Sequence, residues 1–97
     1  MHFEWDETKN RQNQHKHRIA FGLAQEVFLD PLRITMETQD VAGEERFVTI
    51  GSITGTFRLM VVVCTLTLID DRKTVRIISA RKATPNERKF YEKAHQI

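Results

Sequence analysis

The residues best suited to chemistry lie near the C-terminus, where a predicted strand runs into a predicted helix. The stretch 75–87 begins with β-branched residues, which favour a strand, and ends in a helix start. Thr84 and Glu87 have the spacing of a capping box, and Pro85 suits the first helical turn. Outward-facing amides at a helix start, together with nearby guanidinium groups, favour an anion. The cations of this stretch are Arg76, Arg81 and Lys82, and a solvated strand end with ordinary surface charges is the alternative interpretation.

The strand geometry limits how these cations can cooperate. An ideal strand points Arg76 and Arg81 to opposite faces, because an odd number of positions separates them. Both can reach one ligand only if a bulge, a strong twist or a strand end intervenes near 79–81. Arg81 lies nearer the helix start and is the first choice for binding an anion. Arg46 and Arg58, on neighbouring predicted strands, are its natural supplements.

A polar helix near the N-terminus supplies groups that can handle protons. It covers 7–17, follows Asp6 as a cap and has no apolar stripe, so much of its surface must face water or a ligand. Asn13 shares a face with Lys16 and His17, and an imidazole beside a lysine and a carboxamide can move protons next to a phosphate. A solvated cationic helix end is the alternative, and the residues alone slightly favour it.

The histidines of this helix do not predict a metal site. His15 and His17 are two positions apart and do not share a helix face, and no cysteine or suitably spaced carboxylate completes a ligand shell. The sequence therefore predicts neither a metal nor another cofactor. Cys64 lies in an apolar run and is predicted to be a buried thiol rather than a nucleophile.

The elements that must position these groups follow from the apolar patterns. A short N-terminal strand is predicted at 2–6, with Phe3 and Trp5 on one face and Trp5 as a core anchor. A second helix is predicted at 19–29, and its apolar stripe should pack on a sheet. This stripe consists of Phe21, Ala24, Val27 and Phe28.

A sheet accounts for most of the remaining chain. Strands are predicted at 32–38, 45–53 and 57–68, with a hairpin turn between Gly51 and Gly55, and Asp70 to Lys73 turn the chain into the strand that begins at Val75. Short links imply a mainly four-stranded antiparallel sheet, completed by a helix at 84–96. The predicted class is α+β, in one domain that covers residues 1–97.

Composition and charge narrow the function classes. The chain has 97 residues, of which 40% are hydrophobic, and a formal net charge of +2. Residues 26–46 carry six acids against two bases, whereas residues 72–93 carry eight bases against two acids. The basic C-terminal quarter suits a polyanion or an acidic protein partner. No secretion signal or membrane span is visible, and a single cysteine fits a reducing compartment, so a cytoplasmic location is expected.

A set of short pieces spread over nearly the whole chain is specific in its order and spacing. The pieces are Phe3-Glu4-Trp5-Asp6, Lys9, Asn13, Lys16-His17, Val27-Phe28, Asp30-Pro31-Leu32, Glu45-Arg46-Phe47, Ile50-Gly51, the run from Arg76 to Thr84, Glu87-Arg88 and Tyr91. Together they resemble the BrnT family of small bacterial toxins, which is related in fold to the RelE-like ribonucleases.

Three positions depart from the pattern of the family. Arg18 stands where the family usually has a glycine, and Asp40, where many members carry a histidine, is assigned no catalytic role. The segment Leu66 to Asp71 is longer and more apolar than the usual polar hairpin there.

The resemblance implies a RelE-like domain that acts as a metal-independent endoribonuclease, the toxin of a type II toxin–antitoxin module that inhibits translation. Its implied partners are RNA, a BrnA-like ribbon-helix-helix antitoxin and, through the antitoxin, operator DNA; a homodimer or a 2:2 complex is expected. In that scheme the 2′-hydroxyl of RNA attacks the adjacent phosphate. The implied catalytic residues are Lys16, His17, Arg46 and Arg81, and the implied substrate-binding residues are Lys9, Asn13, Arg58, Arg76 and Lys82.

Two other interpretations remain open at this point. The chain can be a non-catalytic basic module that binds nucleic acid or an acidic protein, in which case RNA is bound but not cleaved. The basic patch can also serve only the antitoxin, and the substitution Arg81→Ala would then weaken the complex without changing toxicity.

Overall fold

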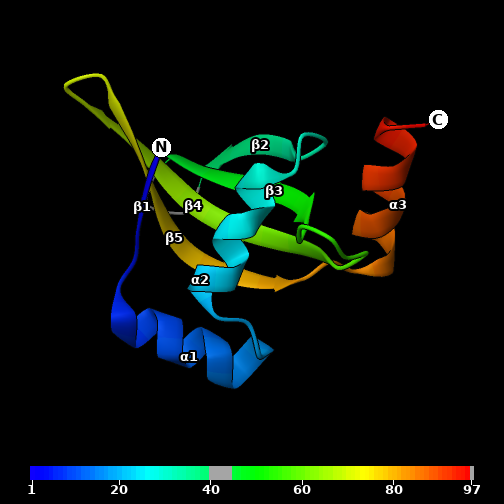
Figure 1. Ribbon diagram of the computed structural model, residues 1–97, viewed down its shortest axis with the longest axis horizontal. Helices are drawn as coiled ribbons and strands as arrows, with labels where there is room; N and C mark the ends of the chain where they lie inside the picture. The colour runs from blue at the N-terminus through cyan, green and yellow to red at the C-terminus, as the bar shows by residue number, and fades with distance from the viewer. Residues whose placement is uncertain (40–44, 97) are drawn as a thin grey trace.

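The computed structural model describes residues 1–39 and 45–96, and these form a five-stranded sheet with helices around it (Figure 1). The strand order is β1-β5-β4-β3-β2. The elements in chain order are β1 (His2–Glu4), α1 (Glu7–His17), α2 (Phe21–Ala24), the 3₁₀ helix η1 (Gln25–Leu29), β2 (Ile34–Gln39), β3 (Glu45–Ser52), β4 (Leu59–Ile69), β5 (Arg72–Lys82) and α3 (Pro85–Ala94).

The sheet confirms the predicted α+β class and corrects the predicted sheet. Strands β2 to β5 pair antiparallel, as expected from their short connections. The N-terminal strand, which was predicted but not counted in the sheet, pairs parallel with β5, with Phe3 opposite Val75. In the described part of the chain, the sheet is therefore mixed and has five strands.

The core lies on both faces of the sheet, since the central strand β4 is apolar on both sides. On one face, Phe21, Ala24 and Val27 are fully buried against the sheet, which confirms the predicted stripe. Trp5 packs against the same cluster and meets the ring of Phe21 edge-on. On the other face a smaller cluster joins Ile50, Leu59, Val61 and Ala83 to Tyr91 of α3.

The helix that was predicted at 19–29 is interrupted. The chain forms only one α-helical turn, Phe21–Ala24, and continues as the 3₁₀ helix η1. Gly51 of β3 explains how closely η1 can approach, because a β-carbon at this position would lie 2.7 Å from Val27 Cγ1. The apolar stripe is therefore kept while the helix geometry changes.

Helix α1 is held to the sheet by asparagines rather than by apolar side chains. Asn10 and Asn13 are 7% and 6% exposed and are the buried residues of this helix. The Asn13 amide donates to the carbonyl oxygens of Ile19 (2.9 Å) and Ala80 (2.8 Å) and accepts from Ala80 N–H (3.1 Å). Asn10 Oδ1 accepts from Phe21 N–H. These bonds fix α1 beside the edge of β5 that β1 leaves unpaired.

Helix α3 begins as predicted and is anchored by polar contacts. Thr84 and Glu87 form the capping box, with Pro85 in the first turn. Farther along, Tyr91 donates to Asp30 Oδ2 at 2.6 Å, and Asp30 also accepts from Ser52 N–H. Burial alone would raise the pKa of Asp30, but these hydrogen bonds outweigh it and lower the pKa. Burial and the bond to Asp30 raise the pKa of Tyr91 to about 12.

Two details of β5 differ from expectation. Val63 lies opposite Ser79 and Cys64 opposite Ile77, so Ile78 is an extra residue that forms a bulge just before the predicted range. Asp70 and Asp71 both have positive φ and form a tight two-residue turn, so Arg72 and Lys73 already belong to the strand. Asp40 lies outside the described residues.

The predicted burial of Cys64 is confirmed, and burial raises the pKa of its thiol to about 11. Across the two described ranges, the helices are too short and too polar to cross a membrane.

Candidate active site

A hollow at one end of the sheet collects basic side chains from four parts of the chain. We call it the basic hollow. Its volume is about 330 Å³. His17 comes from the end of α1, Arg58 from the loop before β4, Lys82 from the end of β5 and Arg88 from α3. The other lining residues are Ile19, Phe57, Leu59 and Met60.

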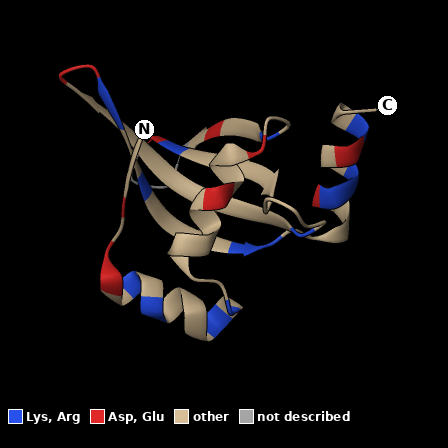
Figure 2. Cartoon of the chain, viewed as in Figure 1, with Lys and Arg blue, Asp and Glu red and all other residues tan. Residues whose placement is uncertain are grey.

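The fold explains why these residues converge. The Asn13 bonds bring the C-terminal end of α1 to the end of β5, where Lys82 pairs with Met60 at the start of β4. The loop between β3 and β4 adds Arg58 at the same end of the sheet. Figure 2 shows Lys and Arg on the last part of β5, on the facing end of α1 and on α3. The arrangement concentrates positive charge at the end of the sheet where β5 ends and β4 begins.

Three of the four basic groups are available for a ligand. Within residues 1–39 and 45–96, no hydrogen bond or ion pair engages the side chain of His17, Arg58 or Lys82, although the backbones of Arg58 and Lys82 are hydrogen-bonded. Arg88 is partly committed, since its Nη2 donates to the Phe57 carbonyl oxygen at 3.1 Å and its Nη1 lies 3.8 Å from Glu92. The hollow thus offers an imidazole, an ammonium and a guanidinium group to an anion.

A second groove adjoins the basic hollow at His17. Lys9, Lys16 and His17 line it along α1, together with Gln12, Asn13, Ile78 and Ser79. Lys9 and Lys16 are exposed. Asn13 is predicted to bind substrate, but its amide is buried and both of its N–H donors are bound to backbone carbonyl oxygens. Asn13 holds the helix that carries the basic groups.

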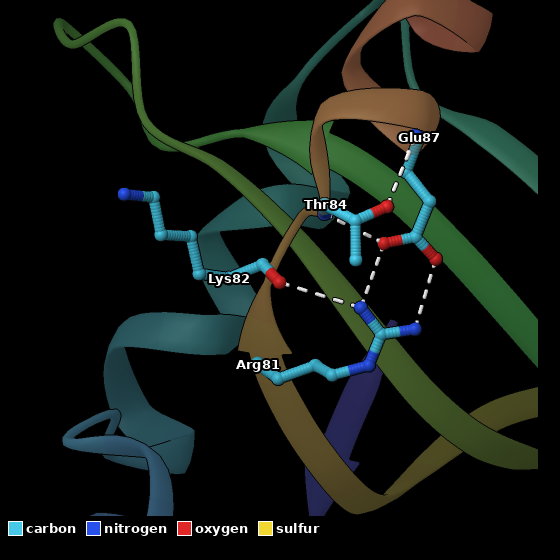
Figure 3. Close-up of polar contacts among 4 residues, drawn as sticks. All are labelled: Arg81, Lys82, Thr84 and Glu87. Carbon is cyan, nitrogen blue, oxygen red and sulfur yellow. Dashed lines mark hydrogen bonds and ion pairs between the residues drawn. The ribbon is translucent and has the colours of Figure 1, made fainter.

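Arg81 is committed to an ion pair inside the fold. Its two terminal nitrogens donate to the Glu87 carboxylate at 2.7 and 2.8 Å (Figure 3). The hydrogen bond to Arg81 is the largest cause that lowers the pKa of Glu87 to about 2, and the same bond raises the pKa of Arg81. Figure 3 also shows Lys82 directed away from this pair, as expected for neighbouring strand residues.

Arg46 and Arg76 lie on the same sheet face as Arg81 and do not line the basic hollow. Arg76 and Arg81 pair with Thr65 and Val61, which are four residues apart in β4, so the bulge at Ile78 brings both arginines to one side. Arg76 lies 3.5 Å from Glu4 of β1. The structure therefore brings together His17, Arg58 and Lys82 from the predicted set, and places Arg46, Arg76 and Arg81 elsewhere.

Two residues that line the basic hollow are not among the site residues predicted from the sequence. Arg88 belongs to the family pattern without an implied role, and the sequence predicts Phe57 as the first residue of a strand. Phe57 is in fact a loop residue and is 94% exposed. Alternation between polar and apolar residues gives no indication of an aromatic residue that a loop holds in solvent.

The described residues contain no group of three or more His, Cys, Asp or Glu side chains arranged to hold a metal ion. His17 lines the basic hollow without a carboxylate or thiol among the other lining residues.

Comparison with protein families matches residues 5–87 to the family described as the ribonuclease toxin BrnT of type II toxin–antitoxin systems. The chain belongs to the BrnT family. The match includes α1, all of β2 to β5 and the start of α3, and so contains every residue of the basic hollow except Arg88. Comparison with curated proteins gives no significant match.

Membership of the BrnT family assigns the chain a ribonuclease role as the toxin of a type II toxin–antitoxin system. It also implies an RNA target and an antitoxin partner. The sequence resemblance is confirmed at this level.

Proposed function

We propose that this BrnT toxin binds a phosphodiester of RNA in the basic hollow and cleaves it there. The observation that carries the proposal is the convergence of His17, Arg58 and Lys82, whose side chains are uncommitted within the described part of the chain, on one hollow. A phosphate diester carries one negative charge, which such a set of donors can bind and orient. The adjoining groove would guide neighbouring phosphates past Lys9 and Lys16.

The proposed reaction is transesterification within the RNA. The 2′-oxygen attacks the adjacent phosphorus, a new 2′-O–P bond forms, and the P–O5′ bond breaks. A base takes the proton of the 2′-hydroxyl, an acid gives a proton to the leaving 5′-oxygen, and the products are a 2′,3′-cyclic phosphate and a 5′-hydroxyl end. His17 is the proposed proton-transfer group, with Lys16 as the alternative.

The remaining charge in this reaction is handled by cations. The phosphorane-like transition state carries more negative charge than the bound diester, and donors that are already in place stabilise this added charge. Arg58 and Lys82 are the proposed donors, with Arg88 at the rim of the hollow. This division of labour corresponds to the metal-independent, RelE-like scheme, and cleavage should therefore persist in excess EDTA.

We assign Arg81 a positioning role in place of the catalytic role that the sequence suggested. Its guanidinium group holds Glu87 and thereby the start of α3, which supplies Arg88. Arg46 and Arg76 share the sheet face of Arg81 and lie outside the basic hollow, and we propose that they contact distant phosphates or the antitoxin.

The cellular setting is also part of the proposal. We propose that the toxin acts in the cytoplasm and inhibits translation by cleaving RNA. A BrnA-like ribbon-helix-helix antitoxin would neutralise it in a 2:2 complex and would supply the contacts to operator DNA. A basic surface of this kind suits an antitoxin segment that carries acidic residues.

The test is cleavage of a short single-stranded RNA by purified toxin variants in EDTA. His17→Ala should lower the cleavage rate about 100-fold, the scale expected for losing general acid–base catalysis. Lys82→Ala should lower it at least about tenfold. Matched controls are His15→Ala, on the same helix outside the basic hollow, and Lys73→Ala, at the far end of β5.

The outcomes separate the proposal from the non-catalytic alternative. An RNA with a 2′-deoxy sugar at the cleaved position should bind but remain intact. Cleavage by His17→Ala and Lys82→Ala at the rate of their controls would remove the basic hollow from the mechanism. Binding of RNA without cleavage by the unmodified chain would support a binding module instead.

A further inference from the structure

Phe57 is the most exposed large hydrophobic side chain in the described part of the chain, at 94%. It contributes almost nothing to the core. It also belongs to none of the aromatic ring pairs among the described residues, which are Phe3 with Phe28, Trp5 with Phe21 and Tyr91 with His95. A single exposed hydrophobic side chain is common on a protein surface, so its exposure alone indicates no ligand. Phe57 differs from the other exposed side chains in that it lines two cavities that also hold Arg88.

The loop that carries Phe57 is held by hydrogen bonds between residues that precede and follow Phe57 in the chain. Ile53 N–H donates to the Arg58 carbonyl oxygen at 3.0 Å, and Arg58 N–H donates to Thr56 Oγ1 at 3.1 Å. Arg88 donates to the carbonyl oxygen of Phe57 itself. These bonds hold the backbone that carries the ring, which lowers the entropic cost of ordering the loop when a partner binds.

Phe57 separates two cavities of different character. On one side is the basic hollow, and on the other is a cavity of about 330 Å³ that we call the side pocket. Phe57, Leu59 and Arg88 line both cavities. The side pocket is also lined by Tyr91, by the polar residues Ser52 and Thr56, and by Glu92. Glu92 Oε1 lies 3.8 Å from Nη1 of Arg88, so the charge of this carboxylate is partly balanced within the pocket.

We propose that Phe57 is the stacking platform for one unpaired nucleobase of the RNA, which enters the side pocket while its phosphate lies in the basic hollow. This inference rests on the proposed function. A nucleotide joins a flat apolar base to an anionic phosphate, and these two parts match the two cavities that Phe57 divides. Every base has a π-face that stacks on an aromatic ring, and only an unpaired base can leave its own stack to do so.

The proposal makes the substrate single-stranded at the cleaved position. Bases in an RNA duplex are paired and stacked on each other, so the side pocket would stay empty and the scissile phosphate would lose one of its two anchors. An RNA loop, a free RNA end or an unpaired stretch of messenger RNA could place a base in the side pocket and its phosphate in the basic hollow.

The test compares two uncleavable probes, a 2′-O-methyl RNA hexanucleotide and the same backbone without bases. Phe57→Ala should weaken binding of the base-containing probe about tenfold, within the range known for aromatic stacking, and leave the abasic probe unchanged. Phe57→Trp should retain binding of the first probe. Phe57→Leu keeps an apolar side chain but lacks the ring face, and it should behave like Phe57→Ala. Leu68→Ala, an exposed apolar residue at the far hairpin, is the matched control.

The outcomes keep this inference apart from the proposed function. If Lys82→Ala weakens both probes while Phe57→Ala weakens neither, the phosphate site stands and the stacking platform is wrong. Equal losses with both probes would show that Phe57 supports the loop and not a base. If the unmodified chain binds neither probe, the stacking platform and the phosphate site both fall. Loss of antitoxin binding alone in Phe57→Ala would make the ring a protein contact and would also overturn the inference.

Discussion

Arg81 at the end of β5 and Glu87 in the first turn of α3 form a two-bonded ion pair, with nitrogen–oxygen distances of 2.7 and 2.8 Å. Glu87 Oε1 also accepts the backbone N–H of Thr84, so one carboxylate closes the capping box and ties the helix to the strand. An arginine that resembles a catalytic residue in the sequence is thus part of the joint that places α3 beside the basic hollow.

This joint should make stability depend on pH in the acid range. The pKa of Glu87 is about 2 when folded and 4.5 in its ordinary state, so its contribution is fully present above about pH 4.5 and is lost as pH falls toward 2. Urea unfolding of the unmodified chain should show this loss, and Glu87→Gln should be less stable at pH 6 but less sensitive to acid. Parallel curves for the two chains between pH 6 and 3 would contradict the assignment.

Arg18 occupies a backbone conformation that suits glycine. Its φ is 61°, and its N–H donates to the Gln14 carbonyl oxygen to end α1. A residue with a β-carbon is strained there, so Arg18→Gly should raise the free energy of unfolding by about 0.5–1 kcal/mol. Arg18→Ala, which keeps the β-carbon, is the control and should change little. The departure from the family pattern at this position would then be a cost to stability, measurable by urea unfolding.

Asn13→Ala should destabilise the protein by about 2 kcal/mol or more, because it leaves the buried carbonyl oxygens of Ile19 and Ala80 and the N–H of Ala80 without their partner. The exposed neighbour Gln12 provides the control, since Gln12→Ala should stay within about 0.5 kcal/mol. Chemical denaturation measures both. Faster amide exchange at Ala80 in Asn13→Ala would locate the effect, and unchanged exchange there would argue against the edge contact.

Two glycine-to-alanine substitutions should have opposite effects. Gly51→Ala would place a β-carbon 2.7 Å from Val27 Cγ1 and 3.1 Å from its carbonyl oxygen, and overpacking of this kind costs about 1–3 kcal/mol. A β-carbon on Gly22, in α2, meets nothing within 4 Å, so Gly22→Ala should be neutral or stabilising by up to about 1 kcal/mol. Thermal melts of the two variants provide the comparison, and equal melting temperatures would refute the close approach of η1 to β3.

Much of the fold could be predicted because local patterns and tertiary packing agree in it. Asp6, Thr84 and Pro85 mark helix starts by chemistry that acts within one turn, and α1 and α3 begin where these residues predict. The central position of β4 followed from its apolar residues on both faces. The parallel pairing of β1 could not be predicted in this way, because nothing in three residues specifies which distant strand they join.

The candidate site was harder to predict, because whether a basic side chain is available for a ligand depends on ion pairs and hydrogen bonds with residues from other elements. Lys82 and Arg81 are adjacent and both basic, and only the position of Glu87 decides that Arg81 is bound while Lys82 is available. Asn13 is predicted from the sequence to bind substrate, whereas its buried bonds to β5 give it a structural role. Residue type and sequence spacing indicated the candidate residues. Their hydrogen-bond and ion-pair partners in the folded chain show which of them are held in structural contacts and which have side chains available for a ligand.

The amide of Asn13 has the same donor and acceptor as a peptide group, and it occupies both outward-facing groups of Ala80 as another strand would. Unlike a strand, a side chain offers no second row of backbone N–H and C=O groups with which a further strand could pair, so the sheet ends at this point. The part of β5 that β1 leaves unpaired is thereby closed, at Ala80, to edge-to-edge pairing with a strand of another copy.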